Sequence, residues 1–584
     1  MRLSPAQPLA GILEPVFAIR TETDLGIGDT EGVRQMIDWC QRHHFHIFQT
    51  LPINETSDDN SPYNAISSLA IEPTTLAVTP EAVPDLPSAE FAEMAKPRLL
   101  AELRRGRVNY PKVKALKRRL LAAAFRHFLA QHFNRETKRA LAFRAFLVEN
   151  ADWLSDYALF RMLMDENGNH PVWERWRAEH QTPARARTWL LALPEARRDE
   201  LMRRQLFFAY VQWIAFTQWE AVKAYAGERN VFLMGDLPFG VGRHSADVWA
   251  NRSFFDLDWS GGAPPEWTFK GDPFIEKWGQ NWGVPNYQWE ELRRHDFAWW
   301  HTRVGNLHRV FHAYRIDHVL GFFRIYSFPW PPERNAEFLP LTPEQVAART
   351  GGRVPGFKPF ADDSPEHRAA NQAQGEAILR VLIEASGDTT IVAEDLGCVP
   401  DYVPPTLHQL GIPGFRIPLF FREADGTYSD PRRYPRLSLA QPTTHDHPPL
   451  AALWETWWRN VEAGMDVENN QRELGHLARF AGLDGAAPPR DFSDRLHEGI
   501  VRAVMASNSW FAVFQITDVL AQAERFNTPG TLSASNWSHR LPQTVRQLDE
   551  DPSLRAKVEM LSQLAQTSER VLGDSAEQLP DTCE

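Results

Sequence analysis

The sequence predicts a (β/α)8 barrel of the TIM type, an α/β fold, with a mostly helical inserted subdomain and long loops on one face. Strand-like and helical patterns alternate along the chain, which is typical of a parallel sheet, and eight strand candidates favour a closed one. Four of these apolar runs lead to an acid and then break into loop residues; the acids are Asp236, Asp317, Glu394 and Asp446. Parallel barrel strands deliver their carboxyl ends to one rim, so the four acids should converge.

A single acid at a strand end is readily explained as a helix cap or a turn residue. Four acids in the same setting are harder to explain in that way. The strand candidates are residues 47–52, 67–72, 231–236, 310–317, 389–394, 415–420, 437–446 and 510–517. The helix candidates include residues 30–43, 208–226, 371–384 and 552–572, and residues 11–15 and 24–29 read as turns.

The predicted organisation is a barrel with interruptions. Its parts are residues 1–82 as the first part of the barrel, 83–204 as the inserted helical subdomain, 205–545 as the rest of the barrel and 546–584 as a helix with a mobile tail. The third part contains a lid loop at 245–289, with little periodicity, and a proline-rich excursion at 329–365. In the insertion, residues 113–128 repeat apolar side chains at helical spacing. The basic residues at 112–119 are expected to form a solvated helix face.

Composition describes an ordinary globular protein of 584 residues, with 43% hydrophobic and 24% charged residues and a net charge of −12. That charge disfavours nucleic acid or an anionic membrane as the main partner. The three cysteines, Cys40, Cys398 and Cys583, are too few and scattered for a disulfide framework or zinc site. No apolar run has the length of a signal peptide or membrane span, so we expect a cytoplasmic protein.

Aromatic residues are abundant, with 21 Trp, 35 Phe and 11 Tyr. Burial in the core is the common fate of tryptophan. Trp282 and Trp289, however, lie in Gly/Pro-rich loops, where stacking on the flat face of a sugar is a natural use. The composition therefore hints at a carbohydrate ligand.

The acids permit glycosidic bond chemistry, which needs one carboxylate at the anomeric carbon and one carboxylic acid to protonate the leaving oxygen. Asp317 and Glu394 fit that pair, and Asp446 could hold sugar hydroxyls and keep Glu394 protonated by like-charge repulsion. Arg315 lies two residues before Asp317, hence on the same strand face, and would keep it ionised. A separation of about 5 to 5.5 Å would indicate retention, and a wider one inversion.

A divalent metal site is the alternative use of this cluster, with Asp236, His318, His445 and His447 as further ligands. No zinc-like histidine spacing occurs, and Arg315 beside a cation would be unfavourable. We therefore expect neither a metal nor another cofactor.

Short motifs carry a resemblance beyond the acids. They are LGIGD at 25–29, SPY at 61–63, SADVW at 245–249, GAPP at 262–265, GQNWG at 279–283, YRIDHVLGFFRI at 314–325, PGF at 413–415 and NTPGT at 527–531. The chain resembles glycoside hydrolase family 77, the 4-alpha-glucanotransferases or amylomaltases, over about residues 11–540. It looks nearest to the subgroup of the plant cytosolic disproportionating enzyme and its bacterial relatives.

The resemblance implies roles for individual residues. Asp317 is implied as the nucleophile, Glu394 as the acid and then the base, and Asp446 as the stabiliser of the transition state. Ligands of the glucose next to the cut are implied at a further three positions, namely Asp236, Arg315 and His445. Two aromatic platforms for the glucan are implied, Tyr63 and Trp282, although either could instead be a packed core residue.

The chain departs from the family pattern at two places. The loop at 266–278 is longer, which puts acceptor preference in doubt, and His447-Pro448 follows Asp446. The implied function is retaining transfer of α-1,4-glucan segments among maltooligosaccharides, maltose, glucose or glycogen-type glucans. An α-glucan hydrolase and a non-catalytic glucan-binding barrel are the alternatives. The oligomeric state is left open.

Overall fold

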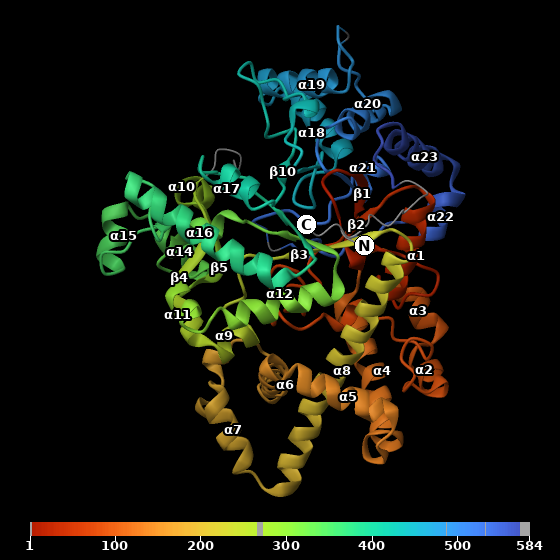
Figure 1. The fold of residues 1–584 in the computed structure, drawn as a ribbon, viewed down its shortest axis with the longest axis vertical. Coiled ribbons are helices and arrows are strands. Elements are labelled where there is room, and N and C mark those ends of the chain that lie inside the picture. Colours follow the sequence, from red (N-terminus) through yellow and green to blue (C-terminus); the bar gives the residue numbers. More distant parts are fainter. Residues whose placement is uncertain (1–2, 266–271, 486, 532, 573–584) are drawn as a thin grey trace, which may run out of the picture.

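The computed structural model describes residues 3–265, 272–485, 487–531 and 533–572, and within them eight parallel strands close into a barrel (Figure 1). The order around the barrel follows the chain and returns from the last strand to the first. The strands are β1 (Leu9–Leu13), β2 (Ile47–Gln49), β3 (Phe232–Leu237), β6 (Ala313–Ile316), β9 (Thr390–Ala393), β10 (Gly414–Arg416), β11 (Ser438–Ala440) and β12 (Phe511–Gln515). The predicted fold class is confirmed.

The first strand was missed by the sequence prediction, which read the region around Gly11 as a turn. β1 pairs in parallel with both β2 and β12, so it closes the barrel. Gly11 is needed for packing, because a Cβ at this position would lie 2.4 Å from the Cβ of Ile47. A glycine that permits close approach of two strands gives the same sequence signal as a glycine in a turn.

Residues 67–72, predicted as the second strand, are not part of the barrel. The N–H groups of Leu69 and Ala70 bond to the Ser67 hydroxyl, and that of Ile71 bonds to the side chain of Gln212. Side chains thus satisfy backbone groups that a strand would offer to its neighbours. The segment makes only an isolated antiparallel bridge, between Asn54 and Ile71, among the described residues.

Helices cover the outside of the barrel. The predicted helix at 30–43 is confirmed as α1 (Thr30–Arg42). Those at 208–226 and 371–384 lie within α8 (Glu195–Gly227) and α16 (Pro365–Ser386), and that at 552–572 contains α23 (Pro552–Thr567). Others are α12 (Ala298–Val310), α13 (Leu320–Phe323), α17 (Val403–Gln409), α18 (Leu450–Glu462), α19 (Val467–Phe480), α20 (Asp494–Met505), α21 (Ile516–Val519) and α22 (Val545–Glu550). The predicted tail at 573–584 lies outside the described residues. No described helix has the length and apolarity to cross a membrane.

The region 245–289, predicted as a loop with little periodicity, is instead largely structured. It contains α9 (Ala246–Ala250), β4 (Phe255–Ala263), α10 (Pro273–Trp278), β5 (Gln280–Tyr287) and the start of α11 (Trp289–Arg294). β4 and β5 form an antiparallel sheet with β7 (Ile325–Phe328) and β8 (Gly356–Lys358). The glycines of β4 and Pro285 in the edge strand β5 conceal these strands in the sequence.

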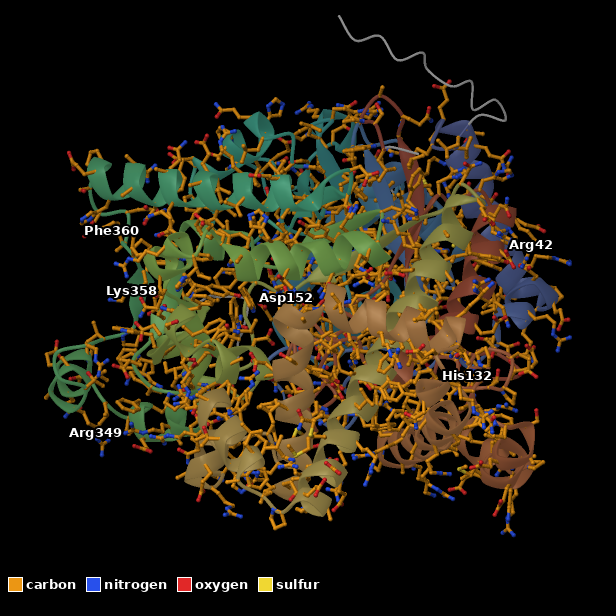
Figure 2. All side chains as sticks on the ribbon, turned by 60° about the horizontal axis from the view of Figure 1, so that its bottom comes forward. Arg42, His132, Asp152, Arg349, Lys358 and Phe360 are labelled. Atoms are coloured by element: carbon orange, nitrogen blue, oxygen red, sulfur yellow. The ribbon has the colours of Figure 1, made fainter. Side chains whose placement is uncertain are left out.

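This second sheet forms one flank of the molecule. The excursion at 329–365 extends it with α14 (Asn335–Phe338) and α15 (Pro343–Arg349). In Figure 2, Lys358 and Phe360 lie on the side opposite Arg42, where α1 ends. Of the lengthened loop at 266–278, residues 266–271 lie outside the described part, and most of the remainder is α10.

The region between β2 and β3 is helical. It holds α2 (Ser88–Met94), α3 (Pro97–Leu103), α4 (Tyr110–Gln131), α5 (Lys138–Glu149), α6 (Ala151–Glu166), α7 (Pro183–Leu191) and α8. These helices project from the lower side of the barrel in Figure 1, and the long α8 runs back to it. Because α8 begins at Glu195, one continuous helix joins this region to β3.

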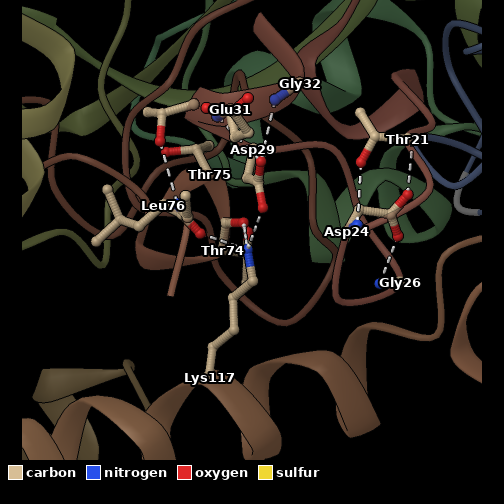
Figure 3. A network of polar contacts seen from close by, with 12 residues as sticks. Thr21, Asp24, Gly26, Asp29, Glu31, Gly32, Thr74, Thr75, Leu76 and Lys117 are labelled. Carbon is tan, nitrogen blue, oxygen red and sulfur yellow. Dashed lines mark hydrogen bonds and ion pairs between the residues drawn. The ribbon is translucent and has the colours of Figure 1, made fainter. Parts of the chain in front are cut away.

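A buried lysine ties this helical region to the barrel (Figure 3). Lys117 on α4 was predicted to lie on a solvated face, but its side chain is 1% exposed. Its Nζ donates to the carbonyls of Thr74 and Leu76 at 2.6 and 2.7 Å and lies 3.9 Å from Asp29, which caps α1. One ammonium group therefore links three segments that are distant in sequence.

We predict that Lys117→Met lowers the free energy of unfolding by about 3 kcal/mol, because it leaves a buried carboxylate and two carbonyls without their cation. Chemical denaturation followed by circular dichroism measures the change. Arg119→Met, on the exposed face of the same helix, is the matched control and should change stability little. Equal stability of the two variants would contradict this role for Lys117.

Candidate active site

The predicted site residues come together at the carboxyl ends of the barrel strands. Asp236 lies in β3, Arg315 in β6, and Asp317 and Glu394 directly follow β6 and β9. Arg315, Asp317, Glu394 and Asp446, the last in the loop after β11, line a cleft of about 2190 Å³, whereas Asp236 lies outside this lining and bonds to Arg315. Widely separated strand ends thus share one cavity, as the barrel topology requires.

Arg315 is the centre of the cluster, and its side chain is 5% exposed. Nη1 donates to both carboxylate oxygens of Asp236 at 3.0 and 2.7 Å, and Nη2 donates to Oδ1 of Asp317 at 2.7 Å. Nη2 also lies 4.0 Å from Oε2 of Glu394. A rigid planar cation with several donors suits such shared contacts.

Asp317 and Glu394 both approach Nη2 of that guanidinium. Oδ1 of Asp317 lies 2.7 Å from it and Oε2 of Glu394 lies 4.0 Å from it, so these two oxygens are no further apart than the sum of the two distances. Such proximity is compatible with the roughly 5 to 5.5 Å between the carboxyl groups of retaining enzymes. Oε2 of Glu394 accepts from the N–H of His318 at 2.7 Å, and Oε1 accepts from that of Leu396 at 3.2 Å, so the carboxyl group is fixed.

The electrostatics favour a protonated Glu394. Burial raises its pKa to about 8; Arg315 opposes this shift and the charge of Asp317 adds to it. Burial likewise raises the pKa of Asp236 to about 6, against the attraction of Arg315. Glu394 can therefore serve as a proton donor near neutral pH.

The surroundings of Asp446 shift its pKa in the opposite direction to that of Glu394. Nε2 of His445 lies 3.2 Å from its Oδ2, and the Asn527 amide donates to its Oδ1 at 2.7 Å. Burial alone would raise the pKa of Asp446, but His445 and Asn527 outweigh it and hold the pKa well below its ordinary value. Asp446 is thus a permanent negative charge in the cleft.

Tyr63 is part of the polar cluster and also lines the cleft. Its hydroxyl donates to Oδ2 of Asp236 at 2.7 Å, and its ring stacks on His445 with centroids 5.3 Å apart. Trp282 is 39% exposed, lines the cleft and meets the ring of His318 edge-on at 4.8 Å. It is free to stack on a sugar, unlike Trp289, which packs into the hydrophobic core.

His447, the departure from the family pattern, closes the turn that carries Asp446. Its Nδ1 accepts from the N–H of Thr444 at 3.2 Å and lies 2.8 Å from the hydroxyl of that residue. Burial lowers the pKa of His447 to about 4, so the ring is neutral and can accept this bond.

Three residues at the site had no role in the sequence prediction. Asn527 bonds to Asp446, Arg525 donates to the backbone carbonyl of Asp446 at 2.7 Å, and Trp537 lies beside Tyr63 and His445. The NTPGT motif at 527–531 was a signal for the first of them. The other two follow no local pattern, because the loop that carries them is brought to the site only by the fold.

Two histidines of the cluster, His445 and His447, lie beside polar protein groups. His445 contacts Asp446, and Nδ1 of His447 contacts Thr444. In the described part of the chain, no three or more His, Cys, Asp or Glu side chains are grouped so that they could hold a metal ion.

Comparison with known proteins agrees with this geometry. A family model described as 4-alpha-glucanotransferase, glycoside hydrolase family 77, matches residues 14–545. The chain belongs to this family. As a 4-alpha-glucanotransferase it is an enzyme of glycosyl transfer, and the resemblance inferred from the short motifs is confirmed.

Similar proteins come from bacteria and plants. A 4-alpha-glucanotransferase of Chlamydia caviae is 31% identical over 569 residues, or 94% of each chain. The 4-alpha-glucanotransferase DPE2 of Oryza sativa subsp. japonica is 26% identical over 94% of this chain and 69% of its own. The fold is similar to an amylomaltase from Streptococcus agalactiae in complex with acarbose, with a TM-score of 0.73 and 22% identity, covering 97% of this chain and 100% of that one.

The pKa of Glu394 leads to a prediction for the pH dependence. We expect kcat/KM to fall as pH rises through about 8, because Glu394 then loses the proton that it must donate, and kcat/KM reports groups of the free enzyme. Initial rates on maltotriose between pH 5 and 10 measure this alkaline fall in kcat/KM.

Asp518 provides the matched control, because burial raises its pKa to about 7 as well. It bonds to Thr443 and to the N–H of Leu450, outside the cleft lining. The alkaline fall in kcat/KM should persist in Asp518→Asn. Loss of this fall in the variant, or a kcat/KM of the wild type that stays level beyond pH 9, would contradict the assignment to Glu394.

Proposed function

We propose that the chain transfers α-1,4-glucan segments by a retaining double displacement, with maltooligosaccharides, maltose, glucose or glycogen-type glucans as donors and acceptors. The observation that carries the proposal is the pair formed by Asp317 and a raised-pKa Glu394 across the Arg315 guanidinium. Glycosidases that retain configuration use such a pair of neighbouring carboxyl groups.

In the first half of the reaction, a carboxylate oxygen of Asp317 bonds to the anomeric carbon while the glycosidic C–O bond breaks. Glu394 gives its proton to the leaving oxygen, and the shortened glucan departs with a free hydroxyl. In the second half, an acceptor hydroxyl attacks the same carbon and passes its proton to Glu394. Asp317 then leaves as a carboxylate, so both acids return to their starting states.

The neighbouring residues support the developing positive charge and hold the sugar. The permanent charge of Asp446 suits an oxocarbenium-like transition state. Arg315 keeps Asp317 in place. Asp236 and His445 are only 1% and 2% exposed and lie outside the cleft lining, so they act on the sugar through Arg315 and Asp446, which they contact. Tyr63 and Trp282 supply aromatic faces, the latter at the exposed side of the cleft.

Transfer rather than hydrolysis requires that a sugar reach the intermediate before water does. One wall of the cleft comes from the second sheet, which carries Trp282, and another comes from the loop at 525–538. These walls supply surface for an acceptor glucan. A non-catalytic role fits poorly with a complete set of three acids, Arg315 and His445. The cytoplasmic location expected from the sequence stays a prediction.

We predict that maltotriose alone yields glucose together with a ladder of longer maltooligosaccharides, because the enzyme passes a maltosyl unit to a second maltotriose and releases the remaining glucose. Thin-layer or anion-exchange chromatography of the products measures this pattern. A product mixture that only shortens would indicate a hydrolase instead.

Two substitutions at the acids are the internal controls for this assay. Asp317→Asn and Glu394→Gln should each lower kcat about a thousandfold or more while the circular dichroism spectrum is kept. Activity retained in Asp317→Asn would remove the proposed nucleophile.

A further inference from the structure

A loop described at residues 525–531 and 533–538, here called the bridging loop, connects Asp446 to the helical region. At one end, Asn527 donates to Oδ1 of Asp446 and Arg525 donates to its backbone carbonyl, both at 2.7 Å. These two bonds fix the side chain and the main chain of the acid. The position of Asp446 therefore depends on where the bridging loop lies.

At its other end, the bridging loop contains a strained residue. Trp537 has a φ of 58°, a left-handed conformation that is rare for a bulky side chain, and is only 6% exposed. Its N–H donates to the carbonyl of Phe526 at 2.8 Å, which joins the two ends of the loop. Its ring lies 5.8 Å from Tyr63 and 6.1 Å from His445, so it backs the stacked pair beside the acids.

Strain of this kind persists only where the surroundings hold it. The hydroxyl of Tyr110 donates to the carbonyl of Trp537 at 2.6 Å. The N–H of Val108 donates to the carbonyl of Ser538 at 2.8 Å, and the Arg107 guanidinium donates to that of Ser535 at 2.9 Å. All three donors belong to the start of α4 or to the residues just before it.

The start of α4 is a firm support for this contact. Asn109 caps the helix by accepting from the N–H of Lys112, and Val113 and Leu116 are buried in the core. Further along the same helix, Lys117 ties α4 to the capping residue of α1 and to the turn at 73–75. The helical region is thus rigidly joined to the barrel beneath the bridging loop.

We propose that Tyr110 is a positioning residue for Asp446 and that the helical region supports the catalytic face through it. The Tyr110 hydroxyl holds the strained Trp537, Trp537 holds Phe526, and the adjacent Asn527 orients the carboxylate. This inference rests on the proposed function only for the role of Asp446. The anchoring of the loop is a separate physical claim.

The test compares Tyr110→Phe, which removes one hydroxyl, with Tyr210→Phe as a matched control. Tyr210 is buried in the same helical region, where its hydroxyl donates to Asp85 at 2.6 Å, away from the cleft. In hydrogen–deuterium exchange of the full chain without substrate, peptides covering 525–538 should exchange faster in Tyr110→Phe only. Unchanged exchange in that loop would overturn the anchoring.

The kinetic arm is a double-mutant cycle with maltotriose. We expect Tyr110→Phe to lower kcat about fivefold with little change in KM, and to have no further effect in an Asn527→Ala background, because both act on Asp446. Tyr210→Phe should combine additively with Asn527→Ala. An additive effect of Tyr110→Phe would overturn the positioning role.

Arg107→Gln provides a second, exposed variant if Tyr110→Phe does not fold. It removes the bonds from Arg107 to the Ser535 carbonyl and to the Ser538 hydroxyl. The same peptides should exchange faster, to a smaller extent than in Tyr110→Phe, and the absence of that change would overturn the anchoring. A wild-type enzyme that fails to lengthen maltotriose would refute the proposed function, while the exchange experiment still reports on the loop.

Discussion

The structure depends on one buried cation, the guanidinium of Arg315. Asp236 and Asp317 both hydrogen-bond to it, and Oε2 of Glu394 lies 4.0 Å from it. Each of these three acids lies in or directly after a different barrel strand. Burying charges costs several kcal/mol each unless they are paired and hydrogen-bonded, so these groups are stable in the core only as a set. The cation keeps the acids close together, and their unequal environments leave Glu394 protonated and Asp446 ionised.

The rest of the chain positions this cluster from three sides. The barrel brings the strand ends together, the second sheet carries Trp282 to the cleft, and the bridging loop orients Asp446. The helical region contributes through α4, which contacts the bridging loop at one end and is fixed by Lys117 further along. On this view the insertion supports the site as well as enlarging the molecule.

Much of this arrangement was predictable because local patterns determine it. The barrel and the four acids follow from apolar runs that lead to carboxylates, and α1 follows from its apolar period. β1 was missed because Gly11 serves close packing, and residues 67–72 were misread because the Gln212 side chain replaces a neighbouring strand. Lys117, Arg525 and Trp537 could not be identified, since their partners are far away in sequence. Tertiary contacts decide whether a lysine on an amphipathic helix is solvated or buried.

In the proposed mechanism, Arg315 prepares Asp317, and no other acid, to bond to the sugar. Peptide mass mapping of the Glu394→Gln variant after reaction with α-maltotriosyl fluoride tests it directly. Fluoride leaves without a proton, and the variant lacks the base for the second step, so the glycosyl-enzyme should accumulate. We expect one maltotriosyl group on Asp317, and its loss when Arg315→Lys is added. A sugar on Asp236 or Asp446, or unchanged labelling with Arg315→Lys, would contradict it.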